Sequence, residues 1–235
     1  MRGDKILEID DLHAWYGESH VLHGVTFDVR EGETISILGR NGAGKTTTLR
    51  AILGILRKRS GTVRFRGEDL LALPLHAVAQ RGIGYVPEER GIFGSLTVAE
   101  NLTLPPVIRN GGMSEDDIYA LFPNLKERRS SPGTTLSGGE QQMLAIARIL
   151  RTGAEIILLD EPTEGLAPVI VERIGEVLQL LKRRGSTIVL VEQNFHFARQ
   201  LADRYVVIEH GRAIDHFAAS EIGGKIAGLA EQLGV

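Results

Sequence analysis

The chain has 235 residues, of which 43% are hydrophobic and 24% are charged, and its formal net charge at pH 7 is −3. These values are typical of a globular protein with one large domain or two small ones. The small negative charge does not favour nucleic acid as a partner. The chain contains no cysteine, which excludes disulfides and thiolate metal sites and suits a reducing compartment. No run approaches the roughly 20 apolar residues that span a bilayer, and the charged start of the chain predicts no signal peptide.

The first third of the chain alternates strand-like runs with turns. Its hydrophobic pattern predicts strands at residues 5–12, 21–29, 33–38 and 62–66. Helices are expected at residues 46–53 and 74–81, and a further strand at residues 83–86. Gly32 and Gly61 mark turns between these elements.

The remainder of the chain begins with a helical stretch and then alternates strands with helices. Residues 97–151 are mostly helical in pattern, with glycine or proline breaks near residues 105, 111 and 132 and an exposed loop at 110–112. Strands follow at residues 156–159, 187–191 and 205–209, separated by helices at 169–184 and 195–202. This alternation predicts a mainly parallel sheet covered by helices on both faces.

Residues 39–46 read Gly-Arg-Asn-Gly-Ala-Gly-Lys-Thr and match the phosphate-loop pattern G-x-x-x-x-G-K-[ST]. In such a loop the backbone N–H groups surround phosphate, and the lysine, here Lys45, reaches the β and γ oxygens. The alternative is a glycine-rich surface turn. The predicted strand before the loop and the predicted helix after it favour the phosphate loop.

A buried strand at residues 156–159 runs into a pair of carboxylates, Asp160 and Glu161. In P-loop proteins an aspartate at such a strand end holds magnesium together with the loop hydroxyl, here Thr46. Glu161 is then placed to polarise a water for attack on the γ-phosphate. The alternative is a solvated strand end, and the upstream phosphate loop argues against it.

Residues 136–140 read Leu-Ser-Gly-Gly-Glu at the start of a strongly helical stretch. Ser137 and Glu140 have the spacing of a capping box. Capping does not explain Gly138 and Gly139, because glycine in a first turn lowers helix propensity. Two glycines let another molecule approach the free N–H groups at the positive end of a helix, so we predict a second anion site here.

The three motifs, in this order, resemble the nucleotide-binding subunit of an ABC transporter, and the resemblance covers the whole chain. It implies an α/β fold of the P-loop NTPase class, with a RecA-like core built on a mainly parallel sheet. It also implies an N-terminal antiparallel β subdomain and an inserted α-helical subdomain. The expected organisation is a single domain over 1–235, with the core and β subdomain at 1–86 and 154–235 and the helical signature subdomain at 87–153.

The resemblance implies ATP and Mg²⁺ as cofactors, bound between two cassettes packed head to tail. Ser137, Gly138 and Gly139 would bind the γ-phosphate held by the other subunit, and Tyr16 matches the aromatic residue that stacks on adenine. The other expected nucleotide contacts are the phosphate-loop residues Gly39, Arg40, Asn41, Gly42, Ala43, Gly44, Lys45, Thr46 and Thr47.

Three departures from the common family pattern refine the resemblance. Glu88 stands where most members have glutamine, Gln193 where most have the switch histidine, and Ala167 where most have aspartate. Together they are similar to one branch, the ATPase subunits of branched-chain amino acid importers. We therefore expect Glu88 to join Thr46 and Asp160 at the metal, and Gln193 to act with Lys45 and Glu161 in catalysis.

The implied function is ATP hydrolysis that powers a membrane importer, with branched-chain amino acids as the expected substrates. Importers of urea and short amides, a lipid exporter, and a non-transport scaffold ATPase are the alternatives; a P-loop kinase or GTPase would leave the signature glycines without a role. The expected partners are transmembrane permease subunits, a second and different cassette, and indirectly a periplasmic substrate-binding protein. The expected location is peripheral, at the cytoplasmic face of the membrane, with the permease docking around residues 88–104.

Overall fold

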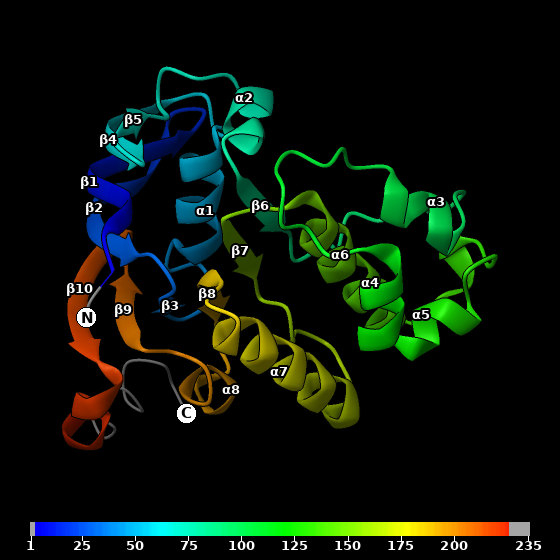
Figure 1. The fold of residues 1–235 in the computed structure, drawn as a ribbon. Coiled ribbons are helices and arrows are strands. Elements are labelled where there is room, and N and C mark those ends of the chain that lie inside the picture. The colour runs from blue at the N-terminus through cyan, green and yellow to red at the C-terminus, as the bar shows by residue number, and fades with distance from the viewer. Residues whose placement is uncertain (1–2, 226–235) are drawn as a thin grey trace.

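The structure is a computed structural model that describes residues 3–225, and its two β-sheets are flanked by helices (Figure 1). The N-terminal sheet is antiparallel, with the strand order β2-β1-β4-β5. Its strands are β1 (Lys5–Tyr16), β2 (Ser19–Arg30), β4 (Arg59–Phe65) and β5 (Glu68–Asp69). The first two strands form a tight hairpin across Gly17 and Glu18.

The second sheet has six strands in the order β10-β9-β3-β8-β7-β6. All neighbouring strands are parallel except β10, which pairs antiparallel with β9 at the edge. In order along the chain its strands are β3 (Thr34–Leu38), β6 (Ile83–Val86), β7 (Ile156–Asp160), β8 (Thr187–Glu192), β9 (Arg204–Glu209) and β10 (Arg212–Ala218). Every residue of β3, β7 and β8 is buried, as expected for parallel strands covered on both faces.

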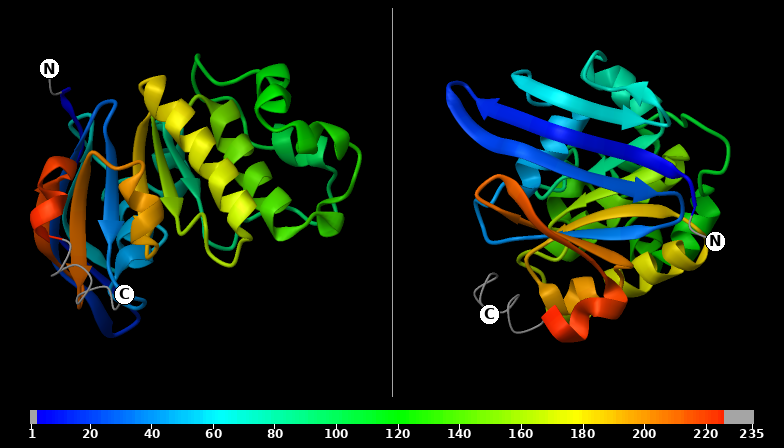
Figure 2. Two further views of the ribbon diagram at one scale, coloured as in Figure 1. Left: turned by 90° about the horizontal axis from the view of Figure 1, so that it is seen from below. Right: turned by 90° about the vertical axis from the view of Figure 1, so that its left-hand side faces the viewer.

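The helices form two groups. Those that pack on the core are α1 (Lys45–Leu53), α2 (Leu75–Gln80), α7 (Pro168–Arg183) and α8 (Phe195–Arg199). Those between β6 and β7 are α3 (Val98–Thr103), α4 (Glu115–Leu121), α5 (Pro123–Glu127) and α6 (Gly138–Thr152). Figures 1 and 2 place this helical insert at the opposite end of the molecule from the antiparallel sheet. One hydrophobic cluster joins α3–α6 to α7 and the parallel sheet, and a second joins the antiparallel sheet to α1.

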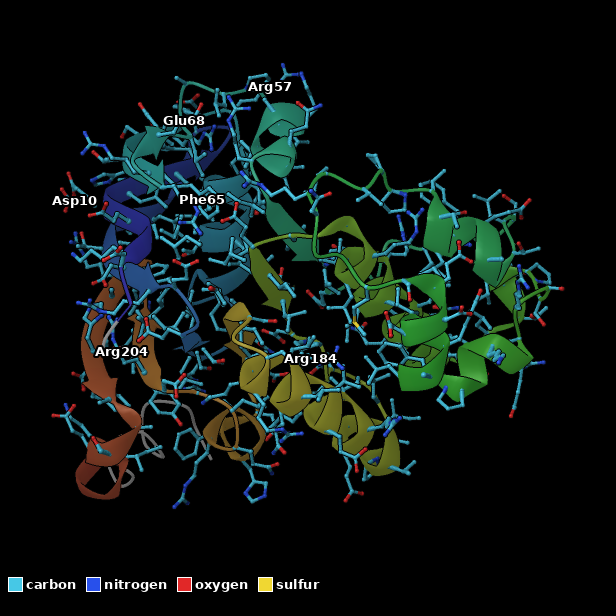
Figure 3. All side chains as sticks on the ribbon, viewed as in Figure 1. Asp10, Arg57, Phe65, Glu68, Arg184 and Arg204 are labelled. Atoms are coloured by element: carbon cyan, nitrogen blue, oxygen red, sulfur yellow. The ribbon has the colours of Figure 1, made fainter. Side chains whose placement is uncertain are left out.

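Arg204 on β9 ties the two sheets together (Figure 3). Its Nη1 lies 3.2 Å from Glu33 Oε2, just before β3, and 3.5 Å from Asp28 Oδ2 on β2. The antiparallel sheet is therefore anchored to the end of the parallel sheet where β3 begins. The phosphate-binding motif follows the opposite end of that strand.

The predicted α/β fold class is confirmed, with the antiparallel N-terminal sheet, the mainly parallel sheet and the helical insert in place. The pattern did not predict β10, because its residues are mostly exposed or half-buried, with only Phe217 buried, and form no apolar run. The expected helix at 195–202 ends at Arg199. The stretch 97–151 contains four α-helices and a short 3₁₀ helix at Gly133–Thr135, joined by loops. Among residues 3–225, no helix combines the length and apolar character needed to cross a membrane.

Candidate active site

The phosphate-loop sequence lies between the end of β3 at Leu38 and the start of α1 at Lys45. Gly42 and Gly44 adopt φ angles of 79° and 113°, the left-handed region that favours glycine. A Cβ on Gly39 would collide with the Ile208 carbonyl group of β9. The loop therefore needs glycine for its own turn and for close packing. The first N–H groups of α1 have no partner within the helix, so they are available to an anion.

Lys45 is almost completely buried, with 4% of its surface exposed. Its ammonium group donates to the carbonyl oxygens of Gly39 at 2.8 Å and Arg40 at 3.2 Å. The same nitrogen lies 3.0 Å from Glu161 Oε1. The structure thus brings the predicted phosphate-binding lysine and the predicted general base into direct contact, although 116 positions separate them (161 minus 45).

Asp160 ends β7 and is fully buried, with both carboxylate oxygens hydrogen-bonded. Thr46 Oγ1 donates to Oδ1 at 2.9 Å, and the hydroxyl of Tyr85 donates to Oδ2 at 3.0 Å. Burial raises the pKa of the Asp160 carboxyl, and the hydrogen bonds from Thr46 and Tyr85 oppose that rise. No motif pointed to Tyr85, which lies on the neighbouring strand β6.

The Thr46 hydroxyl and the Asp160 carboxylate are adjacent oxygen donors at the phosphate loop, which fits magnesium. Within residues 3–225 no group of three or more His, Cys, Asp or Glu side chains could hold a metal by itself. Such a site suits an ion that also relies on nucleotide phosphates. Glu88 is exposed on the segment after β6, and in the described part of the chain it forms no hydrogen bond or ion pair. Its role at the metal stays a prediction.

Glu161 and the predicted switch residue Gln193 lie at the ends of neighbouring strands, β7 and β8 (Figure 1). Glu161 has a φ of 45°, and its N–H donates to Val191 O at 3.0 Å. Gln193 is half-buried and directly follows Glu192, a carboxylate that is only 2% exposed. Burial raises the pKa of Glu192 to about 7. The structure therefore places a second buried acid beside the expected base.

Tyr16 lies at the end of β1, where 43% of its surface is exposed. Burial lowers the pKa of Arg50 on α1, but hydrogen bonding to Tyr16 and Tyr85 and the charge of Glu89 raise it overall. Arg50 also pairs with Glu89 at 2.7 Å. The predicted adenine-stacking residue thus lies against the helix that begins at the phosphate loop, with its surface available for contact.

The signature residues open α6 with the predicted capping box. Ser137 Oγ accepts from the N–H of Glu140 at 3.3 Å, and the Ser137 N–H donates to Glu140 Oε2 at 2.8 Å. Both glycines have neighbours within the chain. A Cβ on Gly138 would lie 3.2 Å from the Arg90 guanidinium, and one on Gly139 would lie 2.8 Å from the Ile170 side chain. The glycines therefore serve internal packing as well as any approach by a second molecule.

A phosphate loop after β3, an Asp-Glu pair at the end of β7 and a capped helix that starts with two glycines in a helical insert define an ATP-hydrolysing cassette of the P-loop class. Residues 22–164 match the family model described as ABC transporter. The chain belongs to the ABC transporter family, and it is an ABC-type ATPase subunit of a transporter.

The chain is similar to the high-affinity branched-chain amino acid transport ATP-binding protein BraG of Pseudomonas aeruginosa, with 42% identity covering 90% of this chain and 92% of BraG. It is 36% identical to the lipopolysaccharide export system ATP-binding protein LptB of Haemophilus influenzae, over 89% of each chain. A dimeric structure of an ATP-binding cassette bound to ADP and Pi matches with a TM-score of 0.78 and 27% identity, covering 91% of this chain and 98% of that one. The predicted family, fold class and ATPase activity are confirmed.

Proposed function

We propose that this chain powers the uptake of branched-chain amino acids from the cytoplasmic face of a membrane. The similarity to BraG supports this substrate class, and the identity is higher than that to the lipopolysaccharide export protein LptB. Uptake of branched-chain amino acids is also supported by three residues that together resemble this branch of importer ATPases, Glu88, Ala167 and Gln193.

Hydrolysis follows from the contacts around Lys45 and Asp160. The Lys45 ammonium group neutralises β and γ oxygens of ATP, which replace its present contact with Glu161. Thr46 and Asp160 would hold magnesium, which supplies charge neutralisation on the phosphates. Glu161, released from Lys45, takes a proton from the attacking water at its carboxylate. The Gln193 amide donates a hydrogen bond to the γ-phosphate, although it cannot take up a proton near neutral pH.

A second cassette completes the nucleotide site in this proposal. The N-terminus of α6, with Ser137, Gly138 and Gly139, faces the γ-phosphate bound by the other cassette. Two identical copies would duplicate the Glu88 and Ala167 departures, whereas a different partner with the common residues would give two unequal sites. We therefore propose a heterodimer of cassettes, on two permease subunits that receive amino acids from a periplasmic binding protein.

An apolar groove offers the docking surface for the permease. It has a volume of about 400 Å³ and is bounded by α1, α2, β6, α6 and the segment 105–108. Leu75 and Ile55 on its rim are 50% and 40% exposed, and Leu104 and Val107 beside it are 49% and 55% exposed. An amphipathic helix of a membrane protein suits such a groove. The groove adjoins the surface at residues 88–104 where docking is expected from the sequence.

The proposal is tested by purifying the membrane complex with a tag on this chain and reconstituting it in vesicles with ATP inside. The expected result is ATP-dependent uptake of leucine, isoleucine or valine through two permeases and two different cassettes. Uptake of urea or short amides only, or release of lipopolysaccharide, would overturn the substrate assignment. For docking, Leu75→Asp should release the chain from the membrane, whereas Ile214→Asp, at a similarly exposed apolar site on β10, should not.

A further inference from the structure

Glu192 is a buried acid that has no role in the hydrolysis steps proposed above. It is the last residue of β8 and is 2% exposed; with Asp160 it is one of the two buried carboxylic acids in residues 3–225. The charge of Glu161, which has the same sign, also acts on it. A carboxylate in this position destabilises the fold unless hydrogen bonds compensate, so an apolar residue would serve packing better.

The compensating hydrogen bonds come from two different loops of the active site. Thr163 Oγ1 donates to Glu192 Oε1 at 2.8 Å, and Thr163 lies two residues after Glu161. The N–H of Asn194 donates to Glu192 Oε2 at 3.2 Å, and Asn194 directly follows Gln193. One buried side chain therefore holds both the turn that carries the expected base and the loop that carries the expected γ-phosphate contact.

Further hydrogen bonds hold the Glu161 turn and the Gln193 loop in place beside Glu192. The Glu161 N–H is held by Val191 O on β8, the strand that Glu192 ends. Asn194 Oδ1 accepts from the Phe197 N–H at 3.1 Å and caps α8. Gln193 is thus fixed between an anchored Glu192 and an anchored Asn194. Two hydrogen bonds hold the left-handed backbone of Glu161: its own N–H is bound to β8, and Thr163, two residues later, is bound to Glu192.

We propose that Glu192 is a positioning residue that joins the Glu161 turn to the Gln193 loop, so that the base and the γ-phosphate contact move as one unit. This inference rests on the hydrolytic roles given to Glu161 and Gln193 above. Misplacing reacting groups by about 1 Å can lower a rate by about 10²-fold. Loss of the bridge should therefore affect turnover more than ATP binding, which depends on Lys45 and the phosphate loop.

Three substitutions separate positioning from a merely structural role. Glu192→Ala removes both hydrogen bonds, and Thr163→Val removes one hydroxyl donor at almost unchanged volume. Glu192→Gln keeps the bridge, because its amide oxygen accepts from Asn194 N–H while its NH₂ donates to Thr163 Oγ1. Thr187→Val is the matched control: Thr187 is buried at the far end of β8, where its hydroxyl accepts from Gly32 N–H at 3.0 Å.

The measurement is kcat and KM for ATP in the assembled transporter. We expect Glu192→Ala and Thr163→Val each to lower kcat by roughly 10- to 10²-fold, with KM for ATP unchanged, and the double variant to lose no more than Glu192→Ala alone. Glu192→Gln should restore turnover, and Thr187→Val should lower thermal stability without changing kcat. If Glu192→Ala does not fold, the kcat values of Thr163→Val and Glu192→Gln still test the positioning role.

Several results would overturn the inference: parental kcat in Thr163→Val, losses that multiply in the double variant, or a Glu192→Gln protein as inactive as the alanine variant. An equal loss of kcat in Thr187→Val would do the same. The proposed hydrolysis mechanism is judged separately by Glu161→Gln. If that variant is inactive while Glu192→Ala and Thr163→Val turn over like the parent, only the Glu192 inference fails.

Discussion

Replacing Glu161 with glutamine tests the assignment of the general base. The side chain keeps its shape and still accepts a hydrogen bond from Lys45 through its amide oxygen, but it can no longer take a proton from water. The turn itself should survive, because the Glu161 N–H remains bound to Val191 O on β8. The change therefore removes proton transfer with little change in geometry.

The expected loss follows from the range measured for general bases. Turnover should fall by roughly 10²-fold or more, which corresponds to about 3 kcal/mol in the activation barrier. The free energy of unfolding should change less than this activation barrier. Lys45 keeps its bonds to the carbonyls of Gly39 and Arg40 at 2.8 and 3.2 Å, so losing the charge of one partner should cost about 1–2 kcal/mol. ATP affinity should rise, because a neutral amide competes less strongly for Lys45 than a carboxylate.

The assay is phosphate release at saturating ATP and Mg²⁺, with nucleotide binding and the monomer–dimer distribution measured on the same preparation. The Gln variant should bind ATP, accumulate as a dimer and release almost no phosphate. Glu164→Gln is the matched control: this glutamate is exposed three residues further on and should leave turnover unchanged. Parental phosphate release by Glu161→Gln, with ATP bound, would refute the assignment of this carboxylate as the base.

Three further predictions concern side chains around the same site. Gln193→Ala should lower turnover in the assembled complex while Gln193→His is tolerated; unchanged turnover in the alanine variant would show that this position only fills space. Tyr85→Phe leaves Asp160 Oδ2 without its donor, so the Mg²⁺ concentration for half-maximal ATPase activity should rise by roughly 10-fold, and an unchanged Mg²⁺ titration would contradict this. The pKa of Glu192 is raised to about 7 in the fold from 4.5, so folding takes up a proton and stability falls as pH rises from about 4.5 through about 7. Glu192→Gln should remove this pH dependence of stability, and it should be more stable than the parent by roughly 2–3 kcal/mol at pH 8 but not at pH 5. Chemical denaturation at both pH values measures the difference. Equal gains in stability at both pH values would contradict a raised pKa of Glu192.

Much of the fold could be predicted because its parallel strands are buried on both faces. Such strands appear in the sequence as continuous apolar runs between turn residues, and β3, β7 and β8 were predicted within one residue of their observed bounds. The edge strand β10 was missed for the opposite reason. Its residues neither alternate in polarity nor form an apolar run, since Ile214 is exposed and Asp215 is half-buried. Pairing with β9 after the His210-Gly211 turn, rather than hydrophobic periodicity, makes it a strand.

The site was predictable where a motif carries its own chemistry, as at Lys45, Thr46 and Asp160. Contacts between distant segments were not predictable. Tyr85 on β6 donates to Asp160 on the adjacent strand β7, and nothing in the local sequence around Tyr85 indicates that bond. The sequence shows Glu192 as an acid directly after the predicted apolar strand at residues 187–191, but its burial and its partner Thr163 could be found only in the structure.

The central claim is that ATP is hydrolysed between the phosphate loop of one cassette and the signature helix of another. It is tested most directly in dimers that this chain forms with itself when no partner cassette is present, by mixing two variants that are each inactive, Lys45→Ala and Gly138→Asp. The second puts a carboxylate at the anion site, beside the Arg90 guanidinium, which must shift slightly to make room. In a mixed dimer the intact phosphate loop of one subunit faces the intact signature of the other, so the mixture should regain phosphate release that neither variant has alone. A mixture that stays inactive at every ratio, at concentrations where the parent hydrolyses ATP, would contradict the shared site.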